Sequence, residues 1–349
     1  MPTSGKESQD FMDTVVYAHL GLPSQKMIVG PGRGLDNAVV KLGHGRVLIV
    51  TVDPVSVIPS LGMRLSAWLS VHLIASDLTA SGVDPEFATF SYNFPPEMKG
   101  AQREAYLRSV GDECRRLGVS IIGGNTGTYP GSGYTVIGAG SMFGVASEES
   151  FVTPAMARVG DRVLMTKHAA IEAAASLANA FPRFVASHAG EGAASRARNL
   201  ARACTTVADA RAARKIGLGR EGVTSMHDAT EGGVLGALDE MAFASRKRFV
   251  VDPTRIPVPG DVALVCACFQ LDPLRTMSEG ALLITCAPDK VPEVRRVMSR
   301  AQVPVAEIGR VERGEGLVLR HGTERPVRYT PSPDGYWGAY EQAINARLR

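Results

Sequence analysis

The sequence has no long apolar segment and almost no imbalance of charge. No stretch approaches the run of about 18 apolar residues that a membrane-spanning helix requires, and the N-terminus lacks an apolar signal region. The 38 basic and 35 acidic residues leave a net charge of +3, which argues against phosphate-backbone binding as the main activity. We therefore expect a soluble, cytoplasmic protein with no nucleic-acid partner and no membrane partner.

Cysteine is scarce, and its spacing is typical of neither a disulfide framework nor a metal site. The five cysteines are odd in number, none forms a Cys-x-x-Cys pair, and Cys266 and Cys268 lie in an apolar stretch without a nearby histidine pair. This pattern predicts buried free thiols in a reducing compartment. A Gly-x-Ser-x-Gly motif is also lacking, which argues against hydrolysis by a serine nucleophile.

Length and composition predict two domains that mix helices and strands. The chain has 349 residues, of which 45% are apolar and 21% charged, enough for a core without disulfide or metal support. Helical and strand patterns occur in both halves, which is typical of the α/β or α+β class. The polar segment 147–150, followed by Pro154, predicts a boundary. We assign residues 1–27 to a polar, mobile tail and a helix, 28–150 to a first domain and 155–349 to a second.

A largely buried helix is predicted over residues 63–81. Leu65, Leu69 and Leu73 recur every four residues, and a second apolar stripe runs beside them. Asp77 lies in the last turn of this helix, where the helix dipole disfavours a negative charge. We therefore expect Asp77 to have a compensating partner, of which a cation is the simplest.

Four side chains with oxygen atoms suited to a hard cation stand at the ends of predicted elements. Open α/β sheets bind ligands at strand ends and tight glycine turns, and carboxylates suit Mg²⁺ with phosphate co-ligands. The competing interpretation is that each residue merely caps a local turn. Spacing alone thus indicates no more than a metal–phosphate enzyme. The four are Asp36 after the glycine-rich turn 30–34, Asp53 after strand 47–52, Asp77, and Asn125 in a predicted Gly-Gly turn.

The segment 226–233 (Met-His-Asp-Ala-Thr-Glu-Gly-Gly) leaves two interpretations open. Asp228 and Glu231 have the spacing of a capping box at a helix start. The two glycines that follow are unusual there, because glycine weakens a helix but permits close approach to a ligand or to another element. His227 and His168 are isolated in sequence, and we interpret them as ordinary core or surface histidines.

The order of these motifs resembles that of the aminoimidazole ribonucleotide synthetase superfamily. This superfamily includes the hydrogenase-maturation carbamoyl dehydratase, thiamine-monophosphate kinase and selenophosphate synthetase. The resemblance covers residues 28–312 and rests on the order of many short motifs. Within it, the residues of segments 166–172 and 226–233 are most similar to those of dehydratase-like members. The matching segments are 34–39, 51–53, 76–78 with Gly82 and Pro85, 123–126, 160–164, 226–233, 278–283 and 308–311.

The resemblance implies a two-domain fold whose N-terminal sheet forms a barrel with that of a second subunit, and hence a homodimer. It implies ATP and Mg²⁺ as cofactors, with ATP bound by the N-terminal domain near the subunit interface and the C-terminal α+β domain closing over it. It also implies that Asp36, Asp53 and Asp77 are metal ligands, with Asp53 and Asp77 acting in catalysis. The residues that it places around nucleotide, phosphate or substrate are Gly34, Asp36, Asp53, Asp77, Gly123, Gly124, Asn125, Thr126, Asp228 and Thr230.

Three positions differ from the pattern of this superfamily. Asn125 stands where aspartate is usual, so a metal site there would have one charge less. Ser76–Asp77 replaces a common Asn-Asp pair, as in the kinase branch. No cysteine follows Cys286, whereas the carbamoyl dehydratase ends in a cysteine that carries the reacting group.

The resemblance therefore implies an ATP-dependent dehydratase or synthetase. Such an enzyme phosphorylates an amide-type or similar acceptor oxygen and then eliminates phosphate, and a protein partner in a maturation pathway is expected. A first alternative is a small-molecule kinase of the thiamine-monophosphate kinase type, which Ser76–Asp77 favours. A second is a nucleotide-binding maturation scaffold with little catalysis, which Asn125 and the missing terminal cysteine favour.

Overall fold

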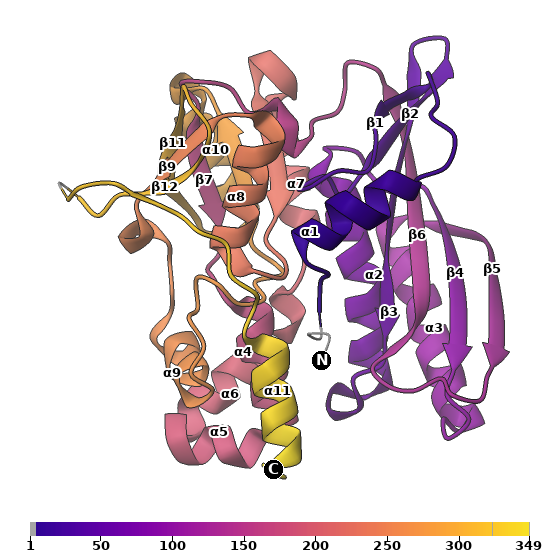
Figure 1. Ribbon diagram of the computed structural model, residues 1–349. Helices are drawn as coiled ribbons and strands as arrows, with labels where there is room; N and C mark the ends of the chain where they lie inside the picture. Colours follow the sequence, from indigo (N-terminus) through magenta and orange to yellow (C-terminus); the bar gives the residue numbers. More distant parts are fainter. Residues whose placement is uncertain (1–4, 323, 349) are drawn as a thin grey trace.

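Two mixed β-sheets lie side by side in the computed structural model, which describes residues 5–322 and 324–348 (Figure 1). The first sheet has the strand order β1-β2-β3-β6-β4-β5, and only its edge pair β4–β5 is parallel. The two longest strands, β3 and β6, pair at its centre. The strands are β1 (Met27–Val29), β2 (Ala38–Gly43), β3 (Arg46–Ser56), β4 (Phe87–Phe94), β5 (Ser120–Thr128) and β6 (Val136–Ser147).

Two long helices cover one face of the first sheet. Helix α2 (Gly62–Ala80) and helix α3 (Gly100–Leu117) share a core with Ile49 of β3 and Phe90 of β4. Because Trp68 on another side of α2 joins the core of the second unit, α2 is buried on almost all sides. The prediction of a buried helix over 63–81 is thereby confirmed.

The outer edge and the other face of the first sheet expose large apolar side chains. Val52 is 63% exposed, Ile122 61% and Val136 53%, and Phe87 and Ile121 are also exposed. Strand β5 forms the edge of the sheet on the side away from the second unit (Figure 1). Apolar surface of this extent is uncommon on a sheet whose other face already packs on helices.

The second sheet has seven strands in the order β13-β12-β9-β11-β7-β10-β8. Helix α8 (Gly233–Ser245) packs on one face, and helices α7 (Val207–Ala213) and α10 (Val291–Arg300) pack on the other. The strands are β7 (Arg162–Thr166), β8 (Val223–Asp228), β9 (Arg248–Val251), β10 (Leu282–Cys286), β11 (Val305–Glu312), β12 (Gly316–Leu319) and β13 (Val327–Arg328).

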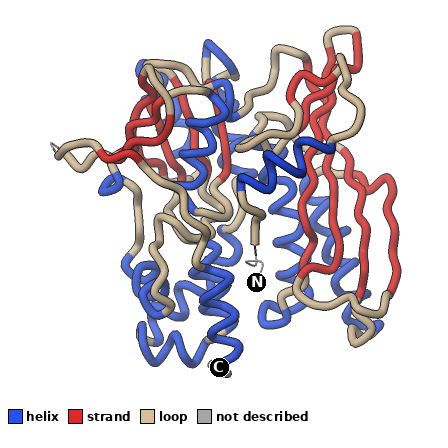
Figure 2. The backbone as a smooth tube through the Cα atoms, viewed as in Figure 1, coloured by secondary structure: helices blue, strands red, loops and turns tan. Residues whose placement is uncertain are grey.

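A group of helices extends the second unit beyond the end of its sheet (Figure 2). These helices pack on one another around alanine-rich faces. They are α4 (Ile171–Ala180), α5 (Pro182–Ala189), α6 (Glu191–Asn199), α9 (Gly260–Cys268) and α11 (Tyr336–Asn345). A further short helical segment, α1 (Gln9–Phe11) with η1 (Met12–Val16) and η2 (Tyr17–His19), lies between the two units (Figure 1).

The structure confirms the mixed α/β class and corrects two local predictions. The segment 123–127, predicted as a turn, lies inside β5, because it pairs with residues 89–93 of β4. The strand predicted over 47–52 continues to Ser56 as β3, so Asp53 lies inside the strand and not after it. All five cysteines are free, and four of them are buried. No helix among the described residues combines the length and apolar character needed to cross a bilayer. The domain boundaries stay a prediction.

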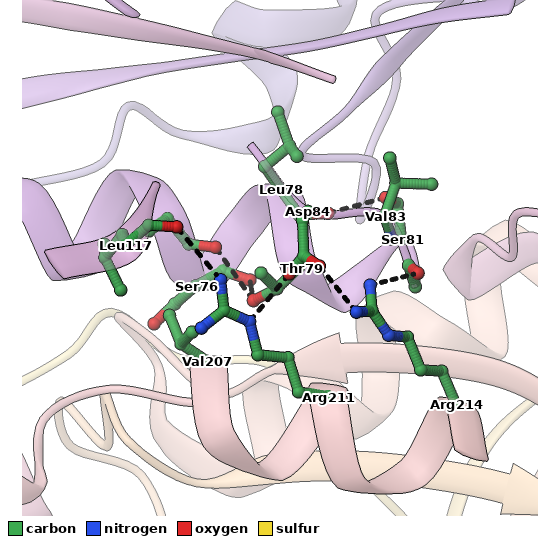
Figure 3. Close-up of polar contacts among 12 residues, drawn as sticks. Ser76, Leu78, Thr79, Ser81, Val83, Asp84, Leu117, Val207, Arg211 and Arg214 are labelled. Carbon is green, nitrogen blue, oxygen red and sulfur yellow. Dashed lines mark hydrogen bonds and ion pairs between the residues drawn. The ribbon is translucent and has the colours of Figure 1, made fainter. Parts of the chain in front are cut away.

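An ion-pair clamp joins the two units beside the C-terminal end of α2. Asp84 accepts hydrogen bonds from Nε of Arg211 (2.7 Å) and from Nη2 of Arg214 (2.5 Å), which belong to α7 and the turn after it (Figure 3). The same guanidinium groups donate to the carbonyl oxygens of Leu117 and Gly82, both at 3.3 Å. The clamp therefore fixes the end of α2, which carries Asp77, against the second unit.

We predict that Asp84→Asn lowers the free energy of unfolding at pH 7 by no more than about 1 kcal/mol, because Asp84 is partly exposed. Burial raises the pKa of Asp84, but hydrogen bonds from Arg211 and Arg214 outweigh it and hold the pKa below its usual value. The stabilisation is therefore complete above about pH 4 and is lost as the pH falls through the folded-state pKa.

Urea unfolding of both proteins at pH 7 and pH 3 measures this difference. Asp112→Asn is the control, because its partner Arg115 lies on the same helix and joins no units. A difference between Asp84→Asn and the wild type that does not shrink at low pH would contradict the assignment.

Candidate functional site

Four aspartates from distant parts of the sequence meet between the two sheets. Asp36 lies in the loop before β2, Asp53 on β3, Asp77 in the last turn of α2, and Asp228 at the end of β8. Burial raises the pKa of Asp77 well above its usual value, and the charges of Asp53, Asp228 and Asp36 raise it further. The structure thus brings the three aspartates singled out in the first half of the chain into one cluster and adds a fourth.

The alternation of β3 explains how Asp53 and Asp77 come together. Thr51, Asp53 and Val55 point to the face of the sheet on which α2 packs, because side chains alternate along a strand. Thr51 Oγ1 donates to Asp77 Oδ2 at 3.0 Å, and Asn37 Nδ2 donates to the Asp77 carbonyl at 2.8 Å. Both of these contacts are with neutral groups, and a cation beside Asp77 stays a prediction. Burial is the largest cause of the raised pKa of Asp77, and a carboxyl–carboxyl hydrogen bond with Asp53 adds to it, so the protonated form of Asp77 is favoured.

Asp228 is the most isolated anion of the cluster. Its side chain is fully buried, and neither carboxylate oxygen has a hydrogen-bond partner among the described residues. Burial, followed by the charge of Asp36, raises the pKa of Asp228 to about 6. A buried carboxylate without partners is costly, and a bound cation would offset that cost.

The capping interpretation of residues 228–231 is wrong. Asp228 is the last residue of β8, and α8 begins only at Gly233. Gly232 precedes the helix with φ of +87°, and its N–H is bonded to Asp334 Oδ2 at 2.9 Å. The other interpretation, that the glycines allow a close approach, fits: a Cβ on Gly233 would come within 2.7 Å of the backbone of Leu274.

His227 joins the two units through a pair of carboxylates. Its Nδ1 lies 2.9 Å from Asp36 Oδ2, and its Nε2 lies 3.0 Å from Glu240 Oε2 on α8. Burial lowers the pKa of His227, but Asp36 and Glu240 outweigh it and raise the pKa well above its usual value. Sequence reasoning treated this histidine as an ordinary one. Its position next to Asp228, at the end of a strand, was the one sign in the sequence that His227 belongs to the site.

Two glutamates that sequence reasoning did not select also face the cluster. Glu279 is buried, its Oε1 has no hydrogen-bond partner among the described residues, and burial followed by Asp228 and Glu172 raises its pKa well above the usual value. Burial, then Asp334 and Glu231, raise the pKa of Glu172 to about 8. Both carboxylates therefore bind a proton more strongly than an exposed glutamate does.

The N-terminal segment reaches the same site. Lys6 Nζ donates to Thr230 Oγ1 at 3.3 Å and lies 3.7 Å from Glu240 Oε1, while its backbone N–H donates to Glu231 Oε1 at 2.8 Å. The segment was expected to be mobile. Residues 1–4 lie outside the described residues, but Lys6 and Gly5 contact the second unit.

The residues predicted around β5 do not join the cluster within one chain. Strands β6 and β4 separate β5 from β3 and therefore from Asp53. Asn125 is exposed on β5, and its Nδ2 lies 3.4 Å from the Tyr129 hydroxyl. Packing within the sheet explains why residue 124 is a glycine, because a Cβ there would overlap the carbonyl group of Phe90 on the neighbouring strand. Gly123 and Thr126 lie on the same exposed edge strand.

The glycine-rich loop 30–36 holds Asp36 in place by docking on α8. Arg33 Nη2 lies 2.6 Å from Asp239 Oδ2, and its guanidinium lies 4.8 Å from the ring centre of Phe243. Gly34 has φ of +71°, and a Cβ there would come within 2.8 Å of the backbone of Glu240. Glycine at this position therefore permits the close contact between loop and helix.

The donor set fits a hard divalent cation. Ligand atoms of Asp36, His227 and Asp228 lie within 4.8 Å of one another, and most atoms of the wider cluster are carboxylate oxygens. Mg²⁺ prefers such oxygens together with phosphate oxygens. The unpartnered oxygens of Asp228 are the strongest sign that a cation belongs here.

Comparison with known proteins assigns the fold to a family. Residues 34–146 match the family model of the AIR synthase related protein N-terminal domain, and residues 158–322 match that of its C-terminal domain. The chain belongs to the AIR synthase related family. Carbamoyl dehydratase HypE of Bradyrhizobium diazoefficiens is 28% identical over 276 residues, which cover 76% of this chain and 74% of that protein. Thiamine-monophosphate kinase of Nitrosopumilus maritimus is 23% identical over 288 residues, covering 82% and 86%.

Solved structures of AIR synthase related proteins show the same fold. HypE in complex with ATP has a TM-score of 0.65 at 19% identity and covers 95% of this chain and 96% of that chain. A HypE–HypF complex has a TM-score of 0.69 at 18% identity and covers 84% and 93%. At these identities the likeness concerns the fold alone.

We predict that Gly34→Ala destabilises the protein more than Gly62→Ala does, by about 1 to 3 kcal/mol. Both glycines have φ of +71°, so the backbone strain is matched, but a Cβ at Gly62 meets nothing within 4 Å. Urea unfolding of the two variants measures the difference. Equal losses would show that the loop does not press on α8.

We predict that Glu172→Gln stabilises the protein at pH 9 by about 1 to 3 kcal/mol and has little effect at pH 5. Because the pKa of Glu172 is raised to about 8 in the folded state, folding binds a proton between about pH 4.5 and pH 8. Stability from this group therefore falls as the pH rises through that window, and glutamine removes the loss.

Thermal and urea unfolding from pH 5 to pH 9 test this sign. The exposed Glu221, changed to glutamine, is the control, and its pH profile should follow that of the wild type. A Glu172→Gln variant whose profile also follows the wild type would refute the prediction.

Proposed function

We propose that the protein is an ATP- and Mg²⁺-dependent enzyme that phosphorylates an amide-type or similar acceptor oxygen and then eliminates phosphate. The observation that carries this proposal is the convergence of Asp36, Asp53 and Asp77 with the unpartnered Asp228 between the two units. Similarity to carbamoyl dehydratase HypE, and to a HypE structure with ATP, supports the nucleotide and the reaction class.

Each part of the cluster has a distinct role in this proposal. Asp36, Asp53 and Asp228 would hold Mg²⁺, which neutralises charge on the phosphate oxygens when bound. Asp77 positions Asp53 through their shared proton, and His227 positions Asp36. Catalysis of phosphoryl transfer depends mainly on such positioning and on charge neutralisation.

The reaction needs a base that remains available inside the cluster. The acceptor oxygen forms a bond to the γ-phosphorus while the bond from that phosphorus to the bridging oxygen breaks, and ADP leaves with the electron pair. Phosphate then departs with the electrons of the carbon–oxygen bond while the acceptor nitrogen forms a further bond to that carbon, and over the two steps this nitrogen loses two protons. Glu279, with a free Oε1 and a raised pKa, is suited to accept one of them.

The remaining predicted residues belong to a dimeric form of the site. We propose that a second copy of this chain covers the apolar surface of the first sheet, where Val52, Ile122 and Val136 are exposed. This arrangement would bring Gly123, Asn125 and the rest of segment 123–126 on β5 to the nucleotide at the subunit interface, as in the barrel implied by the family. The HypE–HypF complex supports a further protein partner in a maturation pathway.

A small-molecule kinase is the second candidate. Ser76 precedes Asp77, as in the kinase branch, and a thiamine-monophosphate kinase is among the relatives. Product analysis separates the candidates: free phosphate with a dehydrated acceptor supports the first, and a stable phosphorylated product supports the kinase. Tight ATP binding without phosphate release for any acceptor would select a maturation scaffold.

We predict that Asp53→Asn abolishes the Mg²⁺-dependent stabilisation by ATP and any ATP turnover, while the unliganded protein stays as stable as the wild type or becomes more stable. The reason is that the variant loses a metal ligand but also loses repulsion within the cluster. Thermal unfolding with and without ATP and Mg²⁺, together with phosphate release, measures both effects.

The matched control is Asp289→Asn, which changes an exposed aspartate far from the cluster. This control should respond to ATP and Mg²⁺ as the wild type does. Unchanged nucleotide response or turnover in Asp53→Asn would refute the assignment of the site.

A further inference from the structure

The N-terminal segment of residues 5–19, which we call the N-terminal strap, places a lysine at the mouth of the acidic cluster. The strap lies between the two units (Figure 1). Gly5 has φ of +111°, and a Cβ there would overlap Glu231 and come within 2.7 Å of Trp337 on α11. The backbone N–H of Lys6 donates to Glu231 Oε1 at 2.8 Å. The start of the strap is therefore seated against the second unit by close packing and a backbone hydrogen bond.

The side chain of Lys6 continues from this seat toward the cluster. Its Nζ lies 3.3 Å from Thr230 Oγ1 and 3.7 Å from Glu240 Oε1. Glu240 contacts His227, which in turn lies 2.9 Å from Asp36. The ammonium group is thus connected through two side chains to a proposed ligand of the metal, and it lies beside a threonine two residues after Asp228.

Solvent exposure makes Lys6 different from His227, the other cationic side chain beside the cluster. In the described part of the chain, two cationic side chains, Lys6 and His227, contact Asp36 or Glu240. His227 is 2% exposed, and both of its ring nitrogens lie close to carboxylates. The Lys6 side chain is 53% exposed and its two polar contacts are long. Lys6 can therefore exchange these contacts for a phosphate, but His227 cannot.

We infer that Lys6 contacts the γ-phosphate of bound ATP from the side of Thr230 and Glu240. This inference rests on the proposed function. A triphosphate brings negative charge into a site where acids outnumber cations, so positive charge beyond that of the metal is needed on the transferred group. A lysine ammonium is a compact point charge that suits phosphate oxygens, and Thr230 is placed to hold it or to share the same oxygen.

The test compares two nucleotides in wild type and Lys6→Met, with a non-hydrolysable ATP analogue and ADP as probes, each with Mg²⁺. The wild type should bind the analogue more tightly than ADP. In Lys6→Met this gain from the γ-phosphate should shrink by about 10- to 100-fold, while ADP affinity stays the same. Calorimetric titration measures both affinities, and thermal unfolding without nucleotide checks the fold.

Two further variants sharpen the result. Lys6→Arg retains the charge and should keep part of the gain, whereas Lys26→Met, which removes an exposed lysine outside the cluster, should keep all of it. An undiminished gain in Lys6→Met overturns the inference, as does an equal loss for both nucleotides, which indicates a structural role. Tighter binding of both also overturns it, because the strap would then only block the site. If the wild type binds neither nucleotide with Mg²⁺, the proposed function itself fails.

Discussion

Repulsion among buried carboxylates is the constraint on which the rest of this structure depends. Asp36, Asp53, Asp77 and Asp228 meet where the two units pack, and burial raises the pKa of three of them. The raised pKa values of Asp77 and His227 favour their protonated forms, and Lys6 places a further positive charge at the mouth of the cluster. Such a cluster opposes folding, and its persistence is typical of a site whose counterion arrives with a ligand.

The packing around the cluster resists this repulsion from several sides. The clamp of Asp84 with Arg211 and Arg214 holds the end of α2. On the other side, the contact of Gly34 with α8 holds the loop that carries Asp36. These contacts join the same two units that supply the carboxylates, so the geometry of the site and the docking of the units are one feature. A change in either contact is expected to move a carboxylate.

Sequence reasoning found the aspartates but not the groups that set their charge. Asp36 and Asp77 stand near the ends of elements, and Asp53 follows an apolar, β-branched run, which are patterns visible in the sequence. Glu172 lies in the first turn of α4, and Lys6 lies in a polar tail, so neither carries a local signal. Asn125 is a different case: its motif is clear, but the two strands between β3 and β5 keep it from the cluster of its own chain, so its role at the nucleotide stays a prediction that depends on a second copy of the chain.

The sequence by itself determined the periodic features: the buried helix α2, the mixed α/β class, the alternation that turns Asp53 toward α2, and the order of motifs that marks the family. These follow from residues close together in the chain, whose spacing repeats with the period of a helix or a strand. The tertiary structure alone decided which acids share a proton, that His227 joins Asp36 to Glu240, and that Lys6 reaches Thr230. Those contacts span between 13 and 224 positions, and only tertiary packing, within each unit and between the two units, can set them.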